Sequence, residues 1–102
     1  MSCQVRFTEE ARDDLKRLYR FALEASHGDG RLASRIIDSI GSAMALLATT
    51  PFAGRRATDD DASLRELVIG FGHGGFVALY EIESADVVTV LAIRNQREDD
   101  YR

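Results

Sequence analysis

The spacing of hydrophobic residues along the chain predicts two helices that follow a short strand. Residues 3–7 alternate between polar and apolar side chains, which is typical of a half-buried strand. Thr8 can cap a helix, and apolar residues then recur every three or four positions as far as Ser26. The same spacing resumes near Arg31 after the turn HGDG, and Pro51 ends it. The sequence therefore predicts an αα-hairpin.

Three further strands are predicted after this hairpin. The stretches LRELVI (64–69), GGFVALYEI (74–82) and DVVTVLAI (86–93) are separated by glycine-rich or polar turns, so they form an antiparallel meander. The polar stretch 51–63 is expected to be a loop. The order β-α-α-β-β-β predicts an α+β fold, with an antiparallel sheet packed against a two-helix hairpin in one domain over residues 1–102. The residues expected to meet in the core are Leu15, Leu18, Ile36, Ile40 and Leu47 from the helices and Leu67, Val77, Leu79, Val88 and Val90 from the strands.

Composition is consistent with a globular protein of the cytoplasm. The 102 residues are 45% hydrophobic and 29% charged, which is the profile of a soluble domain. The first ten residues lack a basic segment followed by an apolar one, and no apolar run approaches the ~18 residues of a membrane span. Cys3 is the single cysteine, so an intramolecular disulfide is excluded. We expect no membrane partner.

The charge distribution argues against general nucleic-acid binding. The formal net charge is -4, and residues 59–102 carry four arginines against ten acidic residues. Phosphate binding depends on cationic surface, so an acidic protein attracts nucleic acid weakly at long range. We expect no sequence-specific binding of nucleic acid by this chain alone.

Several motifs suggest chemistry but fit ordinary turns better. A phosphate loop would need a helix directly after GFGHGG, where a strand is predicted instead. His27 and His73 lie singly in turns, and the run 59–61 of aspartates lacks the spaced oxygens of a calcium loop. No serine or cysteine has a histidine at a predictable distance. The sequence therefore predicts no metal, no cofactor and no nucleophilic catalysis.

Arginine is the residue type that remains as a candidate for function. Arg55 and Arg56 lie in the predicted loop, Arg65 on a strand, and Arg94 and Arg97 near the C-terminal end with Tyr101 beyond them. Guanidinium groups at the end of a sheet can clamp phosphates or the carboxylates of a partner. A solvated rim would show the same pattern.

Five sequence motifs in this order resemble the RelE/ParE superfamily, the toxins of bacterial type II toxin–antitoxin modules. They are V-x-F-T-x-E-A-x-x-D-L at 5–15, P-x-x-G-R at 51–55, R-E-L at 65–67, G-G-F-V-A-L-Y at 74–80 and V-x-V-L-A-I-R-x-Q-R-E-x-x-Y at 88–101. The last of these resembles the ParE branch. ParE-like chains often have a histidine where this chain has Asn95, and asparagine cannot exchange a proton near neutral pH.

The resemblance implies two alternative mechanisms. ParE-like members are reported to poison DNA gyrase, whereas RelE-like members are ribosome-dependent ribonucleases that use lysines and arginines. This chain has one lysine, Lys16, and it has Val77 where ribonuclease members place an arginine. The ParE-like interpretation is therefore a binding inhibitor of gyrase whose target-binding residues are Arg94, Asn95, Gln96, Arg97 and Tyr101. The alternative is a ribonuclease that uses Arg65, Arg94, Arg97 and Tyr101, and a third possibility is a degenerate member that poisons nothing.

The resemblance also implies a protein partner. Toxins of this family are neutralised by a cognate antitoxin, here a ParD-like one, whose C-terminal region wraps the toxin. We expect an apolar groove along the helical hairpin, edged by Arg12, Arg20 and Arg35, which would meet acidic residues of the antitoxin.

Overall fold

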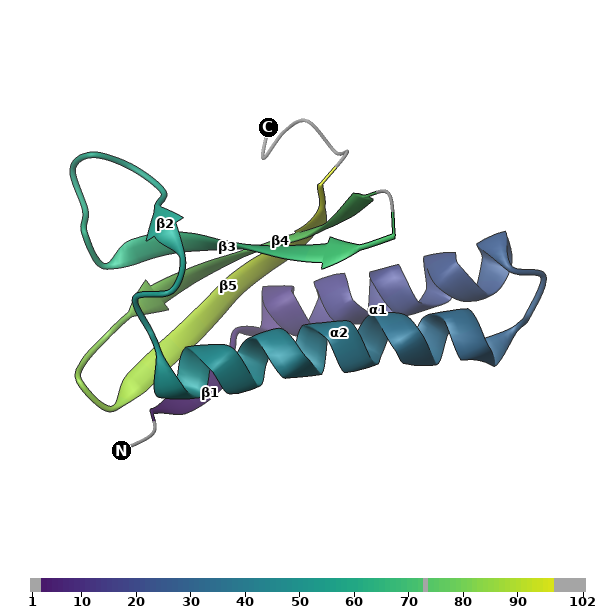
Figure 1. The fold of residues 1–102 in the computed structure, drawn as a ribbon, viewed down its shortest axis with the longest axis horizontal. Helices are drawn as coiled ribbons and strands as arrows, with labels where there is room; N and C mark the ends of the chain where they lie inside the picture. Colours follow the sequence, from purple (N-terminus) through teal and green to yellow (C-terminus); the bar gives the residue numbers. More distant parts are fainter. Residues whose placement is uncertain (1–2, 73, 97–102) are drawn as a thin grey trace.

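Two helices cover one face of a five-stranded sheet (Figure 1). The structure is a computed structural model and describes residues 3–72 and 74–96. The elements in chain order are β1 (Gln4–Phe7), α1 (Glu9–Ala25), α2 (Gly30–Thr49), β2 (Arg55–Arg56), β3 (Leu64–Phe71), β4 (Gly74–Ile82) and β5 (Val87–Asn95). The predicted order of strands and helices is confirmed. The structure adds β2, a two-residue strand inside the stretch predicted as a loop.

The sheet is mixed rather than antiparallel throughout. Its strand order is β1-β5-β4-β3-β2, and the strands from β2 to β5 pair antiparallel. At the other edge β1 runs parallel to β5, with Gln4 opposite Val87 and Phe7 opposite Val90. The prediction of an antiparallel sheet was therefore wrong for β1, because alternation within a strand carries no information on its direction.

A side chain caps the start of each helix, Thr8 as predicted for α1 and Asp29 for α2. Thr8 Oγ1 accepts the Ala11 N–H at 3.1 Å, and an Asp29 carboxylate oxygen accepts the Arg31 N–H at 2.9 Å. Each bond satisfies one of the free N–H groups at a helix start. After α1, His27 takes a left-handed conformation with φ of 55°, and the Gly28 N–H returns to the Leu23 carbonyl at 2.7 Å. This turn reverses the chain into α2.

The core lies between the helical hairpin and the sheet. Its buried members from the helices are Ala11, Leu18, Ala22, Ala33, Ile36, Ile40 and Leu47, and those from the strands are Leu67, Ile69, Phe76, Ala78, Tyr80, Val88, Val90 and Ile93. Leu15 is partly buried against this cluster. The core prediction is thus confirmed for both helices, β3 and β5.

For β4 the prediction chose the wrong set of alternating residues to face the helices. Phe76, Ala78 and Tyr80 belong to the core cluster, so alternation places Val77 and Leu79 on the opposite face of the sheet. Val77 is buried, as predicted, but on that opposite face. All five of these residues lie in one apolar run, and alternation within such a run does not show which face is buried.

A β-bulge in β5 changes which residues face the helices. Leu79 pairs with Ala92 whereas Tyr80 pairs with Val90, so Leu91 is an extra residue in β5. The bulge lets Val90 and Ile93, three positions apart, both enter the core.

Helix α2 is the more apolar of the two helices. By length and composition alone it is long and apolar enough to cross a membrane. Four of its residues are buried against the rest of the fold, and core helices of soluble proteins meet the same criterion. This composition therefore does not identify a membrane segment.

Candidate functional site

Along the edge of β5, the first neighbour is β1 and the next is the start of α1. β1 pairs with β5 only as far as Val90. Beyond that point the Thr8 N–H donates to the Val90 carbonyl at 3.0 Å and the Thr8 hydroxyl to the Leu91 carbonyl at 3.3 Å. One turn further along α1, Asp14 Oδ2 accepts the Ile93 N–H at 3.0 Å. Side chains of the helix thus satisfy backbone groups of the strand that would otherwise be exposed at its edge.

Asp14 also binds the guanidinium group of Arg94. Its Oδ1 accepts from Arg94 Nη1 at 2.7 Å, and Arg17 Nη2 lies 3.4 Å from the same oxygen. Asp14 is 9% exposed and is the one charged residue classed as buried in the described part of the chain. The Arg94 side chain is 33% exposed, so its guanidinium is held at the surface by a nearly buried carboxylate.

Arg94 and Asn95 belong to the sheet. β5 continues for two residues beyond its predicted end, Asn95 pairs with Phe76, and the Gln96 N–H donates to the Gly75 carbonyl at 2.8 Å. The first two predicted target-binding residues, Arg94 and Asn95, therefore lie within β5. Arg97 and Tyr101, the other predicted target-binding residues, lie outside the described residues.

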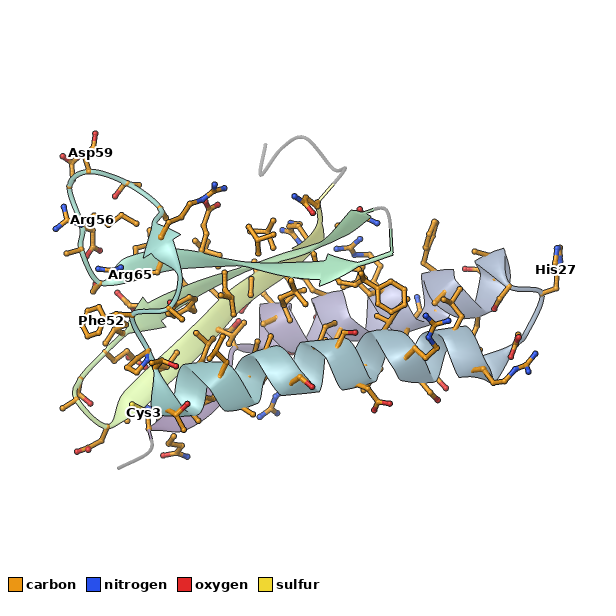
Figure 2. The ribbon with its side chains drawn as sticks, in the orientation of Figure 1. Cys3, His27, Phe52, Arg56, Asp59 and Arg65 are labelled. Atoms are coloured by element: carbon orange, nitrogen blue, oxygen red, sulfur yellow. The ribbon has the colours of Figure 1, made fainter. Side chains whose placement is uncertain are left out.

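The Arg65 side chain bonds the segment between α2 and β3. Its Nη1 donates to the Gly54 carbonyl and its Nε to the Ala62 carbonyl, both at 3.0 Å. The guanidinium carbon also lies 4.9 Å from the centre of the Phe52 ring, close enough for a cation–π interaction. Figure 2 shows Phe52 and Arg65 at the end of the sheet that carries this loop.

Arg65 and Arg94 are not brought together. Arg65 pairs with Tyr80 on one side of β4, and Arg94 pairs with Val77 on the other side. Three residues along a strand correspond to roughly 10 Å, and two strand spacings across the sheet to about the same distance. The described members of the predicted ribonuclease constellation therefore do not form a single site.

The hydroxyl of Tyr80 fastens the chain just after α2. It donates to the Pro51 carbonyl at 2.7 Å and accepts the Gly54 N–H at 2.9 Å. Burial raises the pKa of the Tyr80 phenol, while the Gly54 N–H and the charge of Arg65 act in the opposite direction. A Cβ at Gly54 would lie under 3.0 Å from the Glu66 carbonyl oxygen and from this hydroxyl. The motif P-x-x-G-R thus has a structural role, because its Pro51 and Gly54 bond the Tyr80 hydroxyl.

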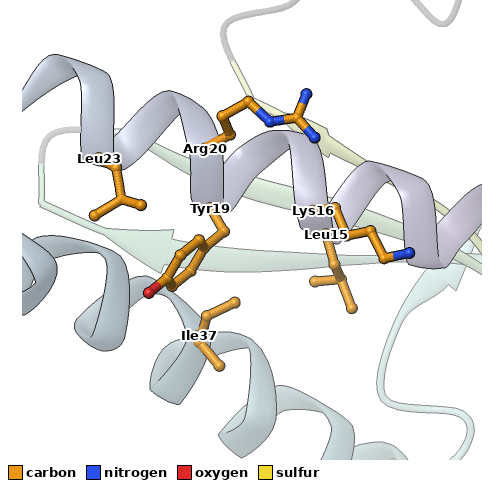
Figure 3. Close-up of a pocket in the computed structure, with 6 residues that line it drawn as sticks. All are labelled: Leu15, Lys16, Tyr19, Arg20, Leu23 and Ile37. Atoms are coloured by element: carbon orange, nitrogen blue, oxygen red, sulfur yellow. The ribbon is translucent and has the colours of Figure 1, made fainter. Parts of the chain in front are cut away.

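A shallow hollow of about 470 Å³ lies between the helices on the side away from the sheet (Figure 3). It is lined by Leu15, Lys16, Tyr19, Arg20, Leu23 and Ile37, a set that we call the hairpin groove. In Figure 3 the ring of Tyr19 points toward Ile37 on α2, and the end of Arg20 points away from the groove. An apolar floor with cationic residues at its rim suits an amphipathic segment that carries acidic residues.

The three arginines predicted to bind the antitoxin have different surroundings. Arg20 borders the hairpin groove, and Arg12 and Lys16 precede it at intervals of four residues, so the three follow one stripe of α1. Arg35 lies on α2, and its guanidinium stacks 5.5 Å from the centre of the Phe71 ring. It lines a neighbouring hollow together with Tyr19 and Arg31.

Comparisons with known proteins identify the family and the fold of the chain. The sequence profile described as "ParE toxin of type II toxin-antitoxin system, parDE" matches residues 5–100. This chain belongs to the ParE toxin family. Among curated protein sequences no match was found.

Solved toxin–antitoxin structures share the fold. A chain of the chromosomal ParDE system from P. aeruginosa superposes with a TM-score of 0.70 at 17% identity, over 92% of this chain and 96% of that one. A chain of the RelBE2 complex from Mycobacterium tuberculosis gives 0.60 at 22% identity, over 93% and 99%. A chain of the E. coli DinJ-YafQ complex gives 0.58 at 9% identity, over 93% of each chain.

Asp14 is the residue of this ParE-family site that sequence reasoning missed. An acidic residue near the start of a helix is ordinarily explained by the positive end of the helix dipole. The position of Asp14 carries a stronger signal, because it lies three residues after Ala11 and four before Leu18, on the stripe that faces the core. A carboxylate on a buried stripe is uncommon and needs a specific partner.

Proposed function

We propose that this ParE-family chain is the toxin of a type II toxin–antitoxin module and inhibits DNA gyrase by binding, without chemistry of its own. The observation that carries the proposal is the family match over residues 5–100. Cleavage of a phosphodiester needs several cationic groups around one phosphate and a group that exchanges a proton. Arg65 and Arg94 lie on different sides of β4, and Asn95 cannot exchange a proton. These features favour a binding inhibitor over a ribonuclease.

The target-binding surface in this proposal is the end of β5 and the residues that follow it. Arg94, Asn95 and Gln96 supply it from the described part of the chain, and Arg97 and Tyr101 complete it. Arginine suits such a surface because its planar group can form two parallel hydrogen bonds with a carboxylate.

Two assays run in parallel test this proposal. Purified toxin is added to a gyrase supercoiling reaction and to a ribosome-dependent mRNA cleavage reaction. Gyrase inhibition without mRNA cleavage supports the proposal. Cleavage of mRNA with normal supercoiling supports the RelE-like alternative, and inactivity of folded protein in both assays supports a degenerate toxin.

The proposed partner is a ParD-like antitoxin that places an acidic, amphipathic segment in the hairpin groove. The groove combines apolar Leu15, Leu23 and Ile37 with Lys16 and Arg20, which is the pattern expected for such a segment. The similar structures of known proteins include toxin–antitoxin complexes. Gyrase and such an antitoxin would both be met in the cytoplasm, where we place the protein.

Charge reversal tests the antitoxin proposal. Arg12→Glu, Arg20→Glu and Arg35→Glu should each weaken antitoxin binding and make the remaining affinity more sensitive to salt, because like charges then face each other. Arg56→Glu is the matched control, since Arg56 is an exposed arginine on β2, far from the helices in Figure 2. Calorimetric titration measures the affinities. Equal affinity for all four variants would place the antitoxin elsewhere.

A further inference from the structure

The two oxygens of the Asp14 carboxylate perform different tasks. Oδ2 accepts the Ile93 N–H at 3.0 Å, which closes the edge of β5. Oδ1 accepts from the Arg94 guanidinium at 2.7 Å. The first task needs only a neutral oxygen, and the amide of asparagine would supply one. The second task needs the negative charge.

Closing the sheet edge does not by itself explain a charged residue at this position. Desolvation of a carboxylate is costly, so a nearly buried charge is tolerated only with a well-placed partner. Thr8 bonds the neighbouring backbone groups of β5 without any charge. The charge of Asp14 has two guanidinium partners, Arg94 at 2.7 Å and Arg17 at 3.4 Å. The shorter contact is the one to Arg94, and it fixes a side chain that would otherwise sample many rotamers.

Arg94 is held at a place where a partner can still reach it. Alternation directs its side chain to the face opposite Ile93, and β1 has already ended, so in the described ranges no strand separates Arg94 from α1. One of its five N–H donors bonds Asp14, and a third of the side chain is exposed. The guanidinium is thus both oriented and accessible.

We propose that Asp14 is a positioning residue for toxicity, which orients the Arg94 guanidinium toward the target before binding. The inference rests on the proposed function, in which the end of β5 contacts the target. Preorganisation lowers the cost of ordering a side chain on association, so loss of the Asp14 charge should weaken target binding. An alternative in which Arg94 merely neutralises Asp14 predicts effects on stability alone.

The test compares Asp14→Asn with Asp13→Asn. Both changes remove one negative charge from α1 by the same substitution, but Asp13 is exposed. Asp14→Asn keeps an oxygen for the Ile93 N–H and should raise the toxin concentration needed for half-maximal gyrase inhibition about tenfold, with a matching loss of growth arrest. Asp13→Asn should behave like the wild type. Antitoxin affinity, measured for all variants, reports whether the fold is intact.

Two further variants separate positioning from simple charge neutralisation. In an Arg94→Ala background, Asp14→Asn should cause no further loss of growth arrest, because Asp14 acts through Arg94. Arg94→Lys keeps a counter-charge for Asp14 but lacks the planar group, so it should retain antitoxin binding and lose toxicity. This variant decides the question if Asp14→Asn does not fold.

The results that overturn the inference are distinct from those that overturn the proposed function. Wild-type growth arrest by Asp14→Asn or by Arg94→Lys, or an additional loss from Asp14→Asn in the Arg94→Ala background, would overturn the positioning role. Growth arrest by the wild type without gyrase inhibition would overturn the gyrase proposal. In that case the growth-arrest series still tests Asp14.

Discussion

At the scale of single residues, Gly54 and Gly41 are predicted to respond oppositely to the same substitution. Gly54→Ala places a methyl group against the Glu66 carbonyl and the Tyr80 hydroxyl, so it should destabilise the fold by about 1–3 kcal/mol. Gly41 lies inside α2, where an added Cβ meets nothing within 4 Å. Gly41→Ala should stabilise by about 0.5–1 kcal/mol, because alanine favours a helix interior. Urea denaturation measures both changes. Destabilisation by Gly41→Ala would contradict the open surroundings of Gly41, and unchanged stability of Gly54→Ala would contradict the close contacts at Gly54.

Tyr80 should make stability fall in alkaline solution. Burial raises the pKa of its phenol in the folded state above the value of about 10 expected in the unfolded chain. The neutral form is therefore favoured by folding, and its contribution is complete below the unfolded pKa and lost as pH rises through the folded one. The free energy of unfolding should decline more steeply above about pH 10 for the wild type than for Tyr80→Phe. Parallel pH profiles would contradict this assignment.

At the scale of elements, two isoleucines on α2 separate stability from partner binding. Ile40 is 3% exposed in the core, so Ile40→Ala should destabilise by about 2–5 kcal/mol. Ile37 is 38% exposed and lines the hairpin groove. Ile37→Ala should therefore change the unfolding free energy much less and weaken antitoxin binding. Thermal unfolding and antitoxin titration measure the two effects, and the reverse ranking in stability would contradict the assigned faces of α2.

The sequence predicts the helices of this protein better than the sheet and its site. The cap at Thr8, the turn 27–30 and a regular apolar stripe mark the helices, because these are local signals. The face of β4, the bulge at Leu91 and the parallel pairing of β1 depend on partners far along the chain, which a strand pattern does not encode. The role of Asp14 was not predicted for the same reason, because its partner Arg94 lies 80 residues away in the sequence.

At the scale of the whole molecule, the surface proposed to bind the antitoxin is separate from the surface proposed to bind the target. The hairpin groove lies on the side of the helices that faces away from the sheet (Figure 3), whereas Arg94 lies at the end of β5. Within the described part of the chain, α1 links the two surfaces, because it contributes Lys16 and Arg20 to one and Asp14 to the other. Variants of the chain should therefore be able to lose one activity and keep the other.

Removal of residues 97–102 tests this separation most directly. The cut follows Gln96 because the Asn95–Phe76 pairing and the bond from Gln96 N–H to the Gly75 carbonyl close the end of the sheet, and a cut before Asn95 would remove both. The truncated protein loses Arg97 and Tyr101 but none of the residues that line the hairpin groove. Growth arrest should therefore fall steeply, while antitoxin affinity and thermal stability stay close to those of the full chain. If the truncated protein is folded and fully toxic, residues 97–102 do not contact the target. The target-binding surface would then be sought near Arg55, Arg56 and Arg65, at the opposite end of the sheet.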